Sequence, residues 1–505
     1  MLHLTNVRYY ERYGKLLSFN FYSKSKLYFN TPDISLLCYF VPSNDINTKS
    51  MKTLYYSILS LIVFASCQAP TPKKTTTEVS ISAEEKFPNK LASSTIYEVN
   101  IRQYTPEGTF KAFATHLPRL KELGVDVLWL MPIHPISATN RKGTLGSYYA
   151  PSNYIDVNPE FGTLEDFKAM LKDAHNLGFD LILDWVPNHT GRDHHWVTEH
   201  PDYYIRDEEG NVTYESMSPT DVWWDTALLD HNNPNTRKAM VDAMKFWVEL
   251  GIDGFRLDHG CGDKIPLYLW EEARAALDPI KDLFWLAECG HETFILDGSY
   301  ADEYELIMRE IIKGEKNADD LSKWIEKDMF KYGRTALRMT YTSNHDLNSW
   351  NGTTAERFGD AHLTLQTLVF TAYGFPLILG GQEVGLNKRL EFFEKDLIDW
   401  SDPLGVQDFY RSLVKLKKDN PAIWAGAAGG FPFTIEADEN VIGFIREIEG
   451  NRVIGIFNLS PENQKVDITN KQAYGSYTDY FTGEAYSLDA APLELEPWEY
   501  LVFVK

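Results

Sequence analysis

Hydrophobic runs of strand length alternate with stretches of helical periodicity along most of the chain. Residues 95–101 and 125–132 are two such runs. Thr163 and Asp166 match a capping box and predict a helix over residues 164–177. Strands and helices that alternate in this way predict a parallel sheet with crossover helices. Between the first two runs, apolar side chains recur near every 3.6 residues, the period of one helix face: Phe110, Phe113, Leu117, Leu120 and Leu123.

Eight strand–helix units fit within residues 94–422, which favours a closed (β/α)8 TIM barrel over an open sheet. The sixth strand is expected at residues 300–304, and the eighth is expected to end within residues 377–383. Residues 190–230 are a polar insertion after the third strand, too long for an ordinary loop. Residues 423–505 carry short strands separated by turns and predict a C-terminal antiparallel β-sandwich domain.

Four of the expected barrel strands end in carboxylates or histidines. Their sequences, in chain order, are DWVPNH (residues 184–189), GFRLD (254–258), WLAE (285–288) and SNHD (343–346). The carboxyl ends of barrel strands lie on one rim, where catalytic groups gather.

Two of these acids suit glycoside cleavage. That reaction needs one carboxylic acid to protonate the leaving oxygen and a second carboxylate to attack the anomeric carbon or activate water. Asp258 and Glu288 end adjacent strands, so their side chains can flank one bond. Arg256 points to the same side of its strand as Asp258 and can hold that carboxylate ionised.

The four segments resemble the four signature regions of the α-amylase family, glycoside hydrolase family thirteen. The resemblance covers about residues 94–505. It implies that Asp258 is the nucleophile, Glu288 the general acid/base, and Asp346 the third carboxylate, which binds sugar hydroxyls and stabilises the transition state. Asp184 matches the structural aspartate of the third strand.

The resemblance also implies which residues contact the sugar at the cleavage site. Arg256, His189 and His345 match residues that contact the nucleophile and this sugar. Residues 146–154 (GSYYAPSNY) resemble a further family region, in which Tyr149 matches the tyrosine that stacks on the sugar ring. We interpret the pair Trp223-Trp224 as packing within the insertion, with a sugar platform as the alternative.

The insertion, residues 190–230, corresponds to domain B of the family, and residues 423–505 correspond to domain C. Many relatives bind calcium between domain B and the barrel. By that pattern Asn188 and Asp230 supply side-chain oxygens and Gly262 supplies a backbone carbonyl. A hard cation prefers oxygen ligands but usually has more than two from side chains, so calcium is a cofactor hypothesis.

The resemblance implies a retaining hydrolase that cleaves α-1,4-glucosidic bonds of starch, maltodextrins or related α-glucans by double displacement. An exo-acting, debranching or transglycosylating member of the same family is the alternative, because residues 259–262 (HGCG) replace the usual contacts to the leaving sugar. A second alternative is an inactive starch-binding lipoprotein, which the presence of all three acids disfavours.

The net charge narrows the range of binding partners. The net charge of −23 disfavours binding to nucleic acid or anionic lipid headgroups, so an α-glucan is the expected partner of a monomeric enzyme.

Cys261 and Cys289 each lie within three residues of a proposed catalytic acid. We expect both cysteines to be small buried residues, with a disulfide between them as the alternative.

The N-terminal sequence predicts targeting. Residues 51–67 have a basic start, a short apolar core and Ser66-Cys67, and resemble a bacterial lipoprotein signal in which Cys67 is lipidated. Residues 1–50 then precede a complete signal, which indicates an over-called translation start. Residues 68–93 are rich in Thr, Pro, Lys and Ser and predict a tether. The expected location is the cell envelope, at the outer membrane, where a lipid anchor is the sole membrane contact.

Overall fold

The computed structural model describes residues 6–10, 16–20, 87, 89–289, 295–333, 336–402, 404–437 and 439–505. The chain divides into two units, Met1–Ser82 and Ala83–Lys505. In the first unit β1 (Asn6–Tyr10) pairs with β2 (Leu16–Asn20) as an antiparallel hairpin. The predicted signal segment with Cys67, and the tether up to residue 86, lie outside the described residues. None of the helices in the described parts of the chain is long and apolar enough to cross a membrane.

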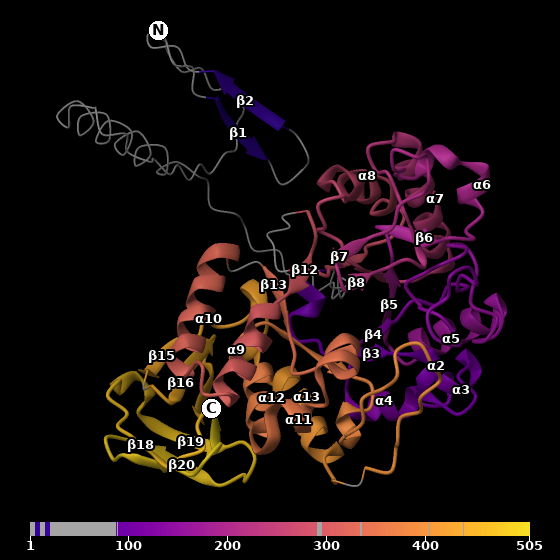
Figure 1. Ribbon diagram of the computed structural model, residues 1–505. Coiled ribbons are helices and arrows are strands. Elements are labelled where there is room, and N and C mark those ends of the chain that lie inside the picture. The colour runs from indigo at the N-terminus through magenta and orange to yellow at the C-terminus, as the bar shows by residue number, and fades with distance from the viewer. Residues whose placement is uncertain are drawn as a thin grey trace, which may run out of the picture. The chain divides into compact units, whose positions relative to one another are not determined.

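Eight parallel strands of the second unit close into a barrel, which confirms the predicted fold class (Figure 1). The strands consist of buried residues, as continuous apolar runs require. In barrel order they are β10 (Gly254–Leu257), β11 (Phe284–Ala287), β12 (Gly298–Tyr300), β13 (Leu337–Thr340), β14 (Phe375–Leu379), β3 (Ile96–Val99), β4 (Val127–Leu130) and β5 (Asp180–Trp185).

Helices surround this barrel and begin where the sequence places their caps. Thr163 and Asp166 form the predicted capping box at the start of α5 (Leu164–Asn176). The other helices of the barrel domain are α2 (Ile101–Tyr104), α3 (Phe110–Ala114), α4 (Leu117–Leu123), α7 (Pro234–Leu250), α8 (Leu267–Leu277), α9 (Asp302–Ile312), α10 (Ala318–Tyr332), α11 (Thr354–Phe358), α12 (His362–Thr371) and α13 (Gln407–Asp419).

Three expectations for this domain are corrected. The helix predicted from Phe110 to Leu123 is split into α3 and α4, because Pro118 lies in the first turn of α4 and lacks an N–H to continue α3. The sixth strand, expected at residues 300–304, is β12 and ends at Tyr300, because the acidic residues that follow favour the N-terminus of α9. The last residues of the predicted tether form the short helix η1 (Asn89–Leu91), and Leu91 is buried.

The insertion and the C-terminal residues form separate β structures. In the insertion β6 (His189–Gly191) pairs with β9 (Thr226–Leu228), and β7 (Ser216–Ser218) pairs with β8 (Asp221–Val222), around α6 (Trp196–Glu199) and the short helix η2 (Pro201–Tyr203). The C-terminal domain is antiparallel, as predicted (Figure 1, yellow). Its six-stranded sheet has the order β15 (Phe433–Ala437), β16 (Val441–Ile448), β17 (Asn451–Asn458), β22 (Tyr500–Val504), β19 (Gly475–Asp479) and β20 (Ala485–Leu488), and β18 (Gln464–Val466) pairs with β21 (Leu493–Leu495).

Candidate active site

The three proposed catalytic acids follow barrel strands at the carboxyl rim. Asp258 comes directly after β10, Glu288 directly after β11, and Asp346 six residues after β13. Their side chains are 14%, 27% and 43% exposed, respectively. All three carboxylates therefore remain within reach of a molecule that binds at the rim.

Arg256 on β10 connects two of these acids from below the rim. Its guanidinium is fully buried. Nη1 donates to Asp258 Oδ1 at 3.1 Å and to Asp184 Oδ1 at 3.0 Å, Nη2 lies 2.5 Å from Glu288 Oε1, and Nε donates to the Tyr300 hydroxyl at 3.0 Å. The sequence predicted the contact with Asp258 alone. One buried cation in fact contacts three carboxylates.

Asp184 has the position of a structural residue, as the resemblance implied. Its side chain is buried, and Oδ2 accepts hydrogen bonds from Trp129 Nε1 at 3.1 Å and from the Tyr149 hydroxyl at 3.0 Å. Burial raises the pKa of Asp184 to about 6, and the charge of Arg256 opposes that rise. Asp184 thus fixes the orientations of Arg256 and Tyr149 and is itself removed from solvent.

The pair Asp258 and Glu288 is electrostatically coupled. Burial raises the pKa of Asp258 well above its ordinary value, the negative charge of Glu288 adds to the rise, and Arg256 opposes it. Glu288 Oε2 accepts a hydrogen bond of 2.6 Å from the backbone N–H of His259. The ionised form of Asp258 therefore depends on Arg256, and the backbone of the residue after Asp258 orients Glu288.

Asp346 is paired with a protonated histidine. Burial by itself would lower the pKa of His345, but Asp346 and Glu98 raise it well above the ordinary value. Burial would raise the pKa of Asp346, but His345 lowers it. His345 Nε2 lies 3.2 Å from Asp346 Oδ2 and 2.9 Å from the Tyr149 hydroxyl, and Nδ1 contacts Glu98. Since the Tyr149 hydroxyl donates to Asp184, it accepts here from His345.

Sequence reasoning missed Glu98. Its side chain is fully buried on β3 and contacts His345, from which it is separated by 247 residues in the chain. A single acid within an otherwise apolar buried strand was the signal that could have identified it, because an ionisable group is buried there only with a partner. Trp129 and Tyr300, which bond Asp184 and Arg256, were missed as well.

The remaining predicted sugar contacts lie in the same cluster. His189 is buried, and its Nε2 is 2.7 Å from the backbone oxygen of Tyr149. Burial lowers the pKa of His189 to about 4, so it is neutral near pH 7. The Tyr149 ring stacks on His345 with centroids 5.5 Å apart and lies 5.9 Å from the Arg256 guanidinium carbon. The structure therefore brings Tyr149, His189, Arg256 and His345 together; their roles on substrate stay predictions.

The pair Trp223-Trp224 lies beside this cluster. Trp223 contacts the rings of His189 and His259 edge-on, with centroids 5.5 and 6.0 Å apart. Trp224 is 51% exposed and lies under Lys142. Trp223 therefore packs against the site, while Trp224 presents an accessible ring.

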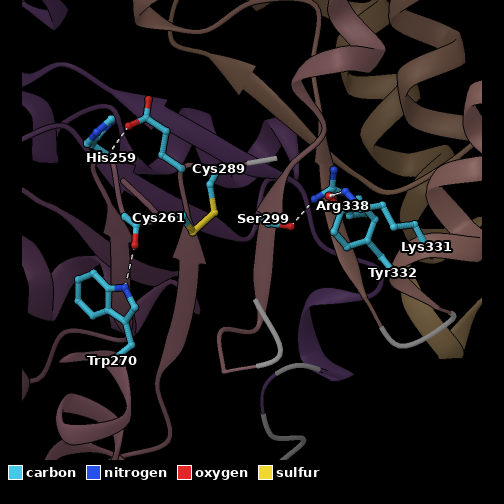
Figure 2. Close-up of a disulfide and its surroundings, with 10 residues drawn as sticks. His259, Cys261, Trp270, Cys289, Ser299, Lys331, Tyr332 and Arg338 are labelled. Atoms are coloured by element: carbon cyan, nitrogen blue, oxygen red, sulfur yellow. Dashed lines mark hydrogen bonds between the residues drawn. A yellow bond between two sulfur atoms is a disulfide. The ribbon is translucent and has the colours of Figure 1, made fainter. Parts of the chain in front are cut away.

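A disulfide joins Cys261 to Cys289, with Cα atoms 5.8 Å apart (Figure 2). The sequence had left this bond open and favoured two small buried residues; both cysteines are half-buried and bonded to each other. Trp270 Nε1 donates to the backbone oxygen of Gly260 at 2.8 Å on the same segment. The disulfide thus ties the segment after Asp258 to the residue next to Glu288.

Reduction of this disulfide is expected to lower kcat by at least about threefold, because Glu288 then loses one constraint on its position. That factor corresponds to an increase of ~0.7 kcal/mol in the activation free energy. The measurement is kcat on starch before and after complete reduction, verified by a thiol count. A Cys261→Ser/Cys289→Ser variant serves as the control, since reductant should leave its activity constant. Unchanged kcat in fully reduced protein would show that the bond has no part in positioning Glu288.

The residues predicted to bind calcium fit a metal poorly. Asp230 Oδ1 already accepts from Asn232 N, and the Gly262 carbonyl accepts from Ile265 N. Asn188 Oδ1, in contrast, is buried without a hydrogen-bond partner among the described residues, so of these three predicted ligand oxygens it alone is free to bind a cation. No cluster of three His, Cys, Asp or Glu suited to a metal ion occurs in the described part of the chain.

Lys264 lies where the resemblance placed calcium, between the insertion and the barrel. Asn188 Nδ2 donates to Glu215 Oε2 at 3.3 Å, and Glu215 Oε1 accepts from Lys264 Nζ at 2.6 Å. The Glu215 side chain is 8% exposed. Burial alone would raise the pKa of Glu215, but its bond to Lys264 lowers it. The positive charge that a buried carboxylate needs is therefore present in the protein itself.

Comparisons with known proteins agree with this geometry. The family model for the catalytic domain of α-amylase matches residues 85–268. Alpha-amylase 2 of Dictyoglomus thermophilum is 24% identical over 417 residues, which cover 76% of this chain and 69% of that protein. Neopullulanase 2 of Thermoactinomyces vulgaris is 26% identical over 404 residues, covering 75% of this chain and 67% of that protein.

A solved structure extends the likeness over most of the chain. The α-amylase of Lactobacillus plantarum superposes with a TM-score of 0.73 and 28% identity, and the match covers 82% of this chain and 99% of that one. The family model, the relatives and the carboxylates assembled around Arg256 agree: the chain is similar to α-amylases in sequence and fold, and residues 85–268 match the catalytic-domain model of that family.

Proposed function

We propose that the protein is a retaining glycoside hydrolase that cleaves α-1,4-glucosidic bonds in starch, maltodextrins or related α-glucans. One observation carries the proposal: Arg256 holds Asp258 and Glu288 on adjacent strand ends, with both carboxylates accessible at the barrel rim. The likeness to proteins named α-amylase supports the substrate class.

The reaction has two steps. In the first, an Asp258 oxygen attacks the anomeric carbon and forms a glycosyl ester, while Glu288 gives its proton to the leaving glycosidic oxygen. In the second, Glu288 takes a proton from water, which attacks the same carbon and releases Asp258. Asp346, kept ionised by His345, binds sugar hydroxyls and stabilises positive charge on the ring. Two displacements retain the anomeric configuration.

The test is a time course with soluble starch, pullulan and maltotriose, with products resolved by chromatography. A spread of early maltodextrins from starch, with pullulan untouched, is the expected result. A single short product would support the exo-acting alternative, and cleavage of pullulan would support the debranching one. Products longer than the substrate would support the transglycosylating alternative. The absence of any reaction would favour the starch-binding alternative.

We infer that Lys264, rather than calcium, supplies the cation between the insertion and the barrel. EDTA is therefore expected to leave the melting temperature and activity unchanged. Lys264→Met is expected to lower the melting temperature by about 2–4 °C, because buried Glu215 loses its partner. Scanning calorimetry checks both, with the exposed Lys238→Met as the matched control. A fall in melting temperature with EDTA that added Ca²⁺ reverses would instead support the calcium hypothesis.

Attachment to the cell envelope through a lipid on Cys67 is a separate proposal and rests on residues 51–67. Labelling of growing cells with a fatty-acid analogue should mark the wild-type protein and leave the Cys67→Ser variant unmarked. Equal labelling of both proteins would refute it. The monomeric state is likewise a proposal, and light scattering of the purified protein tests it.

A further inference from the structure

The chain between β13 and α11 carries Asp346, the proposed third carboxylate of the site. We call residues 342–352 the Asp346 loop, and its second half is formed by the short helix η3 (Leu347–Asn351). Asn344 Oδ1 accepts from Leu347 N at 2.8 Å, so residues on the two sides of Asp346 are bonded to each other. Because the loop is tied internally in this way, a shift of its ends is expected to displace Asp346.

A side chain from α11 reaches both ends of the Asp346 loop. Arg357 lies on this helix, and its side chain is 4% exposed. Nη2 donates to the Thr342 carbonyl at 2.8 Å and to the Ser343 hydroxyl at 3.1 Å, at the beginning of the loop. Nε donates to the Gly352 carbonyl at 2.9 Å, at the end of the loop. One buried guanidinium therefore links the two ends.

The charge of Arg357 is balanced by an acid from α9. Nη1 donates to Glu305 Oε1, and the Glu305 side chain is 4% exposed. Glu305 Oε2 accepts from Arg309 Nε at 2.9 Å on the same helix. Burial raises the pKa of Glu305, and the charges of Arg357 and Arg309 oppose that rise. Glu305 thus fixes one side of the guanidinium, while the other N–H groups bond the loop.

A contribution to stability does not by itself explain an ion pair at this position. The cost of removing two charges from water offsets most of their attraction, and apolar residues of similar volume can often replace such a pair. Apolar side chains, however, have no donors for the carbonyls of Thr342 and Gly352. A lysine has donors on one atom only, whereas the planar guanidinium of Arg357 presents its donors in several fixed directions. The contacts therefore require the shape of arginine as well as its charge.

We propose that Arg357 is a positioning residue of the active site, which holds Asp346 in place by linking the two ends of its loop. Glu305 acts through Arg357, because it orients the guanidinium. The inference rests on the proposed hydrolase function, in which Asp346 stabilises positive charge on the sugar ring. That charge develops in the transition state, so a displaced Asp346 should lower turnover more than substrate affinity.

The test compares the kinetics of Arg357→Lys and wild type on soluble starch, at a temperature where both are folded by circular dichroism. The variant keeps a positive charge beside Glu305 but cannot bond both ends of the loop. We expect kcat to decrease about tenfold or more, with KM changed by less than about threefold, because small displacements of catalytic groups are costly.

Arg338 on β13 provides the matched control. Its side chain is 3% exposed, and it donates to Asp328 on α10 at 3.0 Å and to Ser299 on β12 (Figure 2). Arg338→Lys therefore loses the same kind of buried bonds, but to partners outside the Asp346 loop. Both variants should lower the melting temperature by a similar amount, about 2–5 °C. Turnover should fall in Arg357→Lys and stay at the wild-type value in Arg338→Lys.

Two further variants separate the charge of the pair from its geometry. In Glu305→Gln the amide oxygen can still accept from Arg357, so the bonds to the loop remain, and kcat should stay within about twofold of the wild type. The double variant Arg357→Met/Glu305→Met removes both charges together, so it avoids the cost of leaving one of them unpaired. It should reproduce the loss of kcat, and it replaces Arg357→Lys if that variant does not fold.

The outcomes distinguish this inference from the proposed function. Wild-type kcat in Arg357→Lys or in the double variant would overturn the positioning role and leave the hydrolase assignment intact. An equal loss of kcat in Arg338→Lys would overturn it as well, since the effect would then be a general consequence of lost stability. If the wild type cleaves no α-glucan, the hydrolase assignment is wrong, and the positioning role is wrong with it.

Discussion

Replacement of Asp258 by Asn should lower kcat on starch by about 10⁴-fold or more, because an amide cannot form the glycosyl ester. Glu288→Gln should cause a similar loss on starch. On an aryl α-glycoside with a good leaving group, Glu288→Gln should lose less activity, since that leaving group needs no proton in the first step. Asp258→Asn should gain nothing from such a substrate. The two variants thereby separate the nucleophile from the acid.

Both variants should fold, because each replaces a carboxyl by an amide of the same shape. Circular dichroism and melting temperatures close to those of the wild type are the required controls. Burial and Glu288 raise the pKa of Asp258, so kcat/KM of the wild type should begin to decrease at a higher pH on its acid side than an ordinary aspartate would produce. Near-normal turnover by Asp258→Asn would refute the assignment of Asp258 as the nucleophile.

Replacement of Arg256 by Met is expected to destabilise the protein by about 3–5 kcal/mol and abolish activity, because an uncompensated group of buried carboxylates remains. Arg256 is fully buried and contacts Asp184, Asp258 and Glu288. Denaturant titration measures the loss. The deficit should shrink as the pH is lowered, since protonation of Asp184 and Asp258 removes the charges that the variant leaves unpaired.

Arg389→Met is the matched control for this experiment. Arg389 is ion-paired with Glu356 at 2.8 Å, but both side chains are about half exposed, so solvent can replace the partner. Its free energy of unfolding should stay close to that of the wild type. Equal stability of Arg256→Met and the wild type would contradict the view that one guanidinium compensates the carboxylates of the rim.

The sequence predicted the barrel and the place of three acids at its rim because both depend on local patterns. Apolar runs that end in an acid, such as residues 252–258, specify a buried strand and the rim position of its last residue in one short segment. Glu98 shows the limit of such reasoning, since its partner His345 is 247 residues away. The contacts of Arg256 with Asp184 and Glu288 likewise depend on how β10 is aligned with β5 and β11. That alignment exists only in the folded barrel.

Features outside the regular alternation were harder to predict. The division of α3 from α4 depends on the single residue Pro118 within an otherwise continuous apolar period. The sequence favoured two small buried residues at Cys261 and Cys289 over a disulfide, because their spacing does not show that β10 and β11, which precede them, are neighbours in the folded barrel.

The most direct test of the account is to identify the residue that carries the covalent intermediate. The wild-type protein would be incubated with a 5-fluoro-α-glucosyl fluoride, which forms the glycosyl ester faster than water removes it, and examined by mass spectrometry of the intact protein and its peptides. The account predicts one added glycosyl group, located on Asp258. A label on Asp346, or release of fluoride with no labelled residue, would contradict double displacement through Asp258.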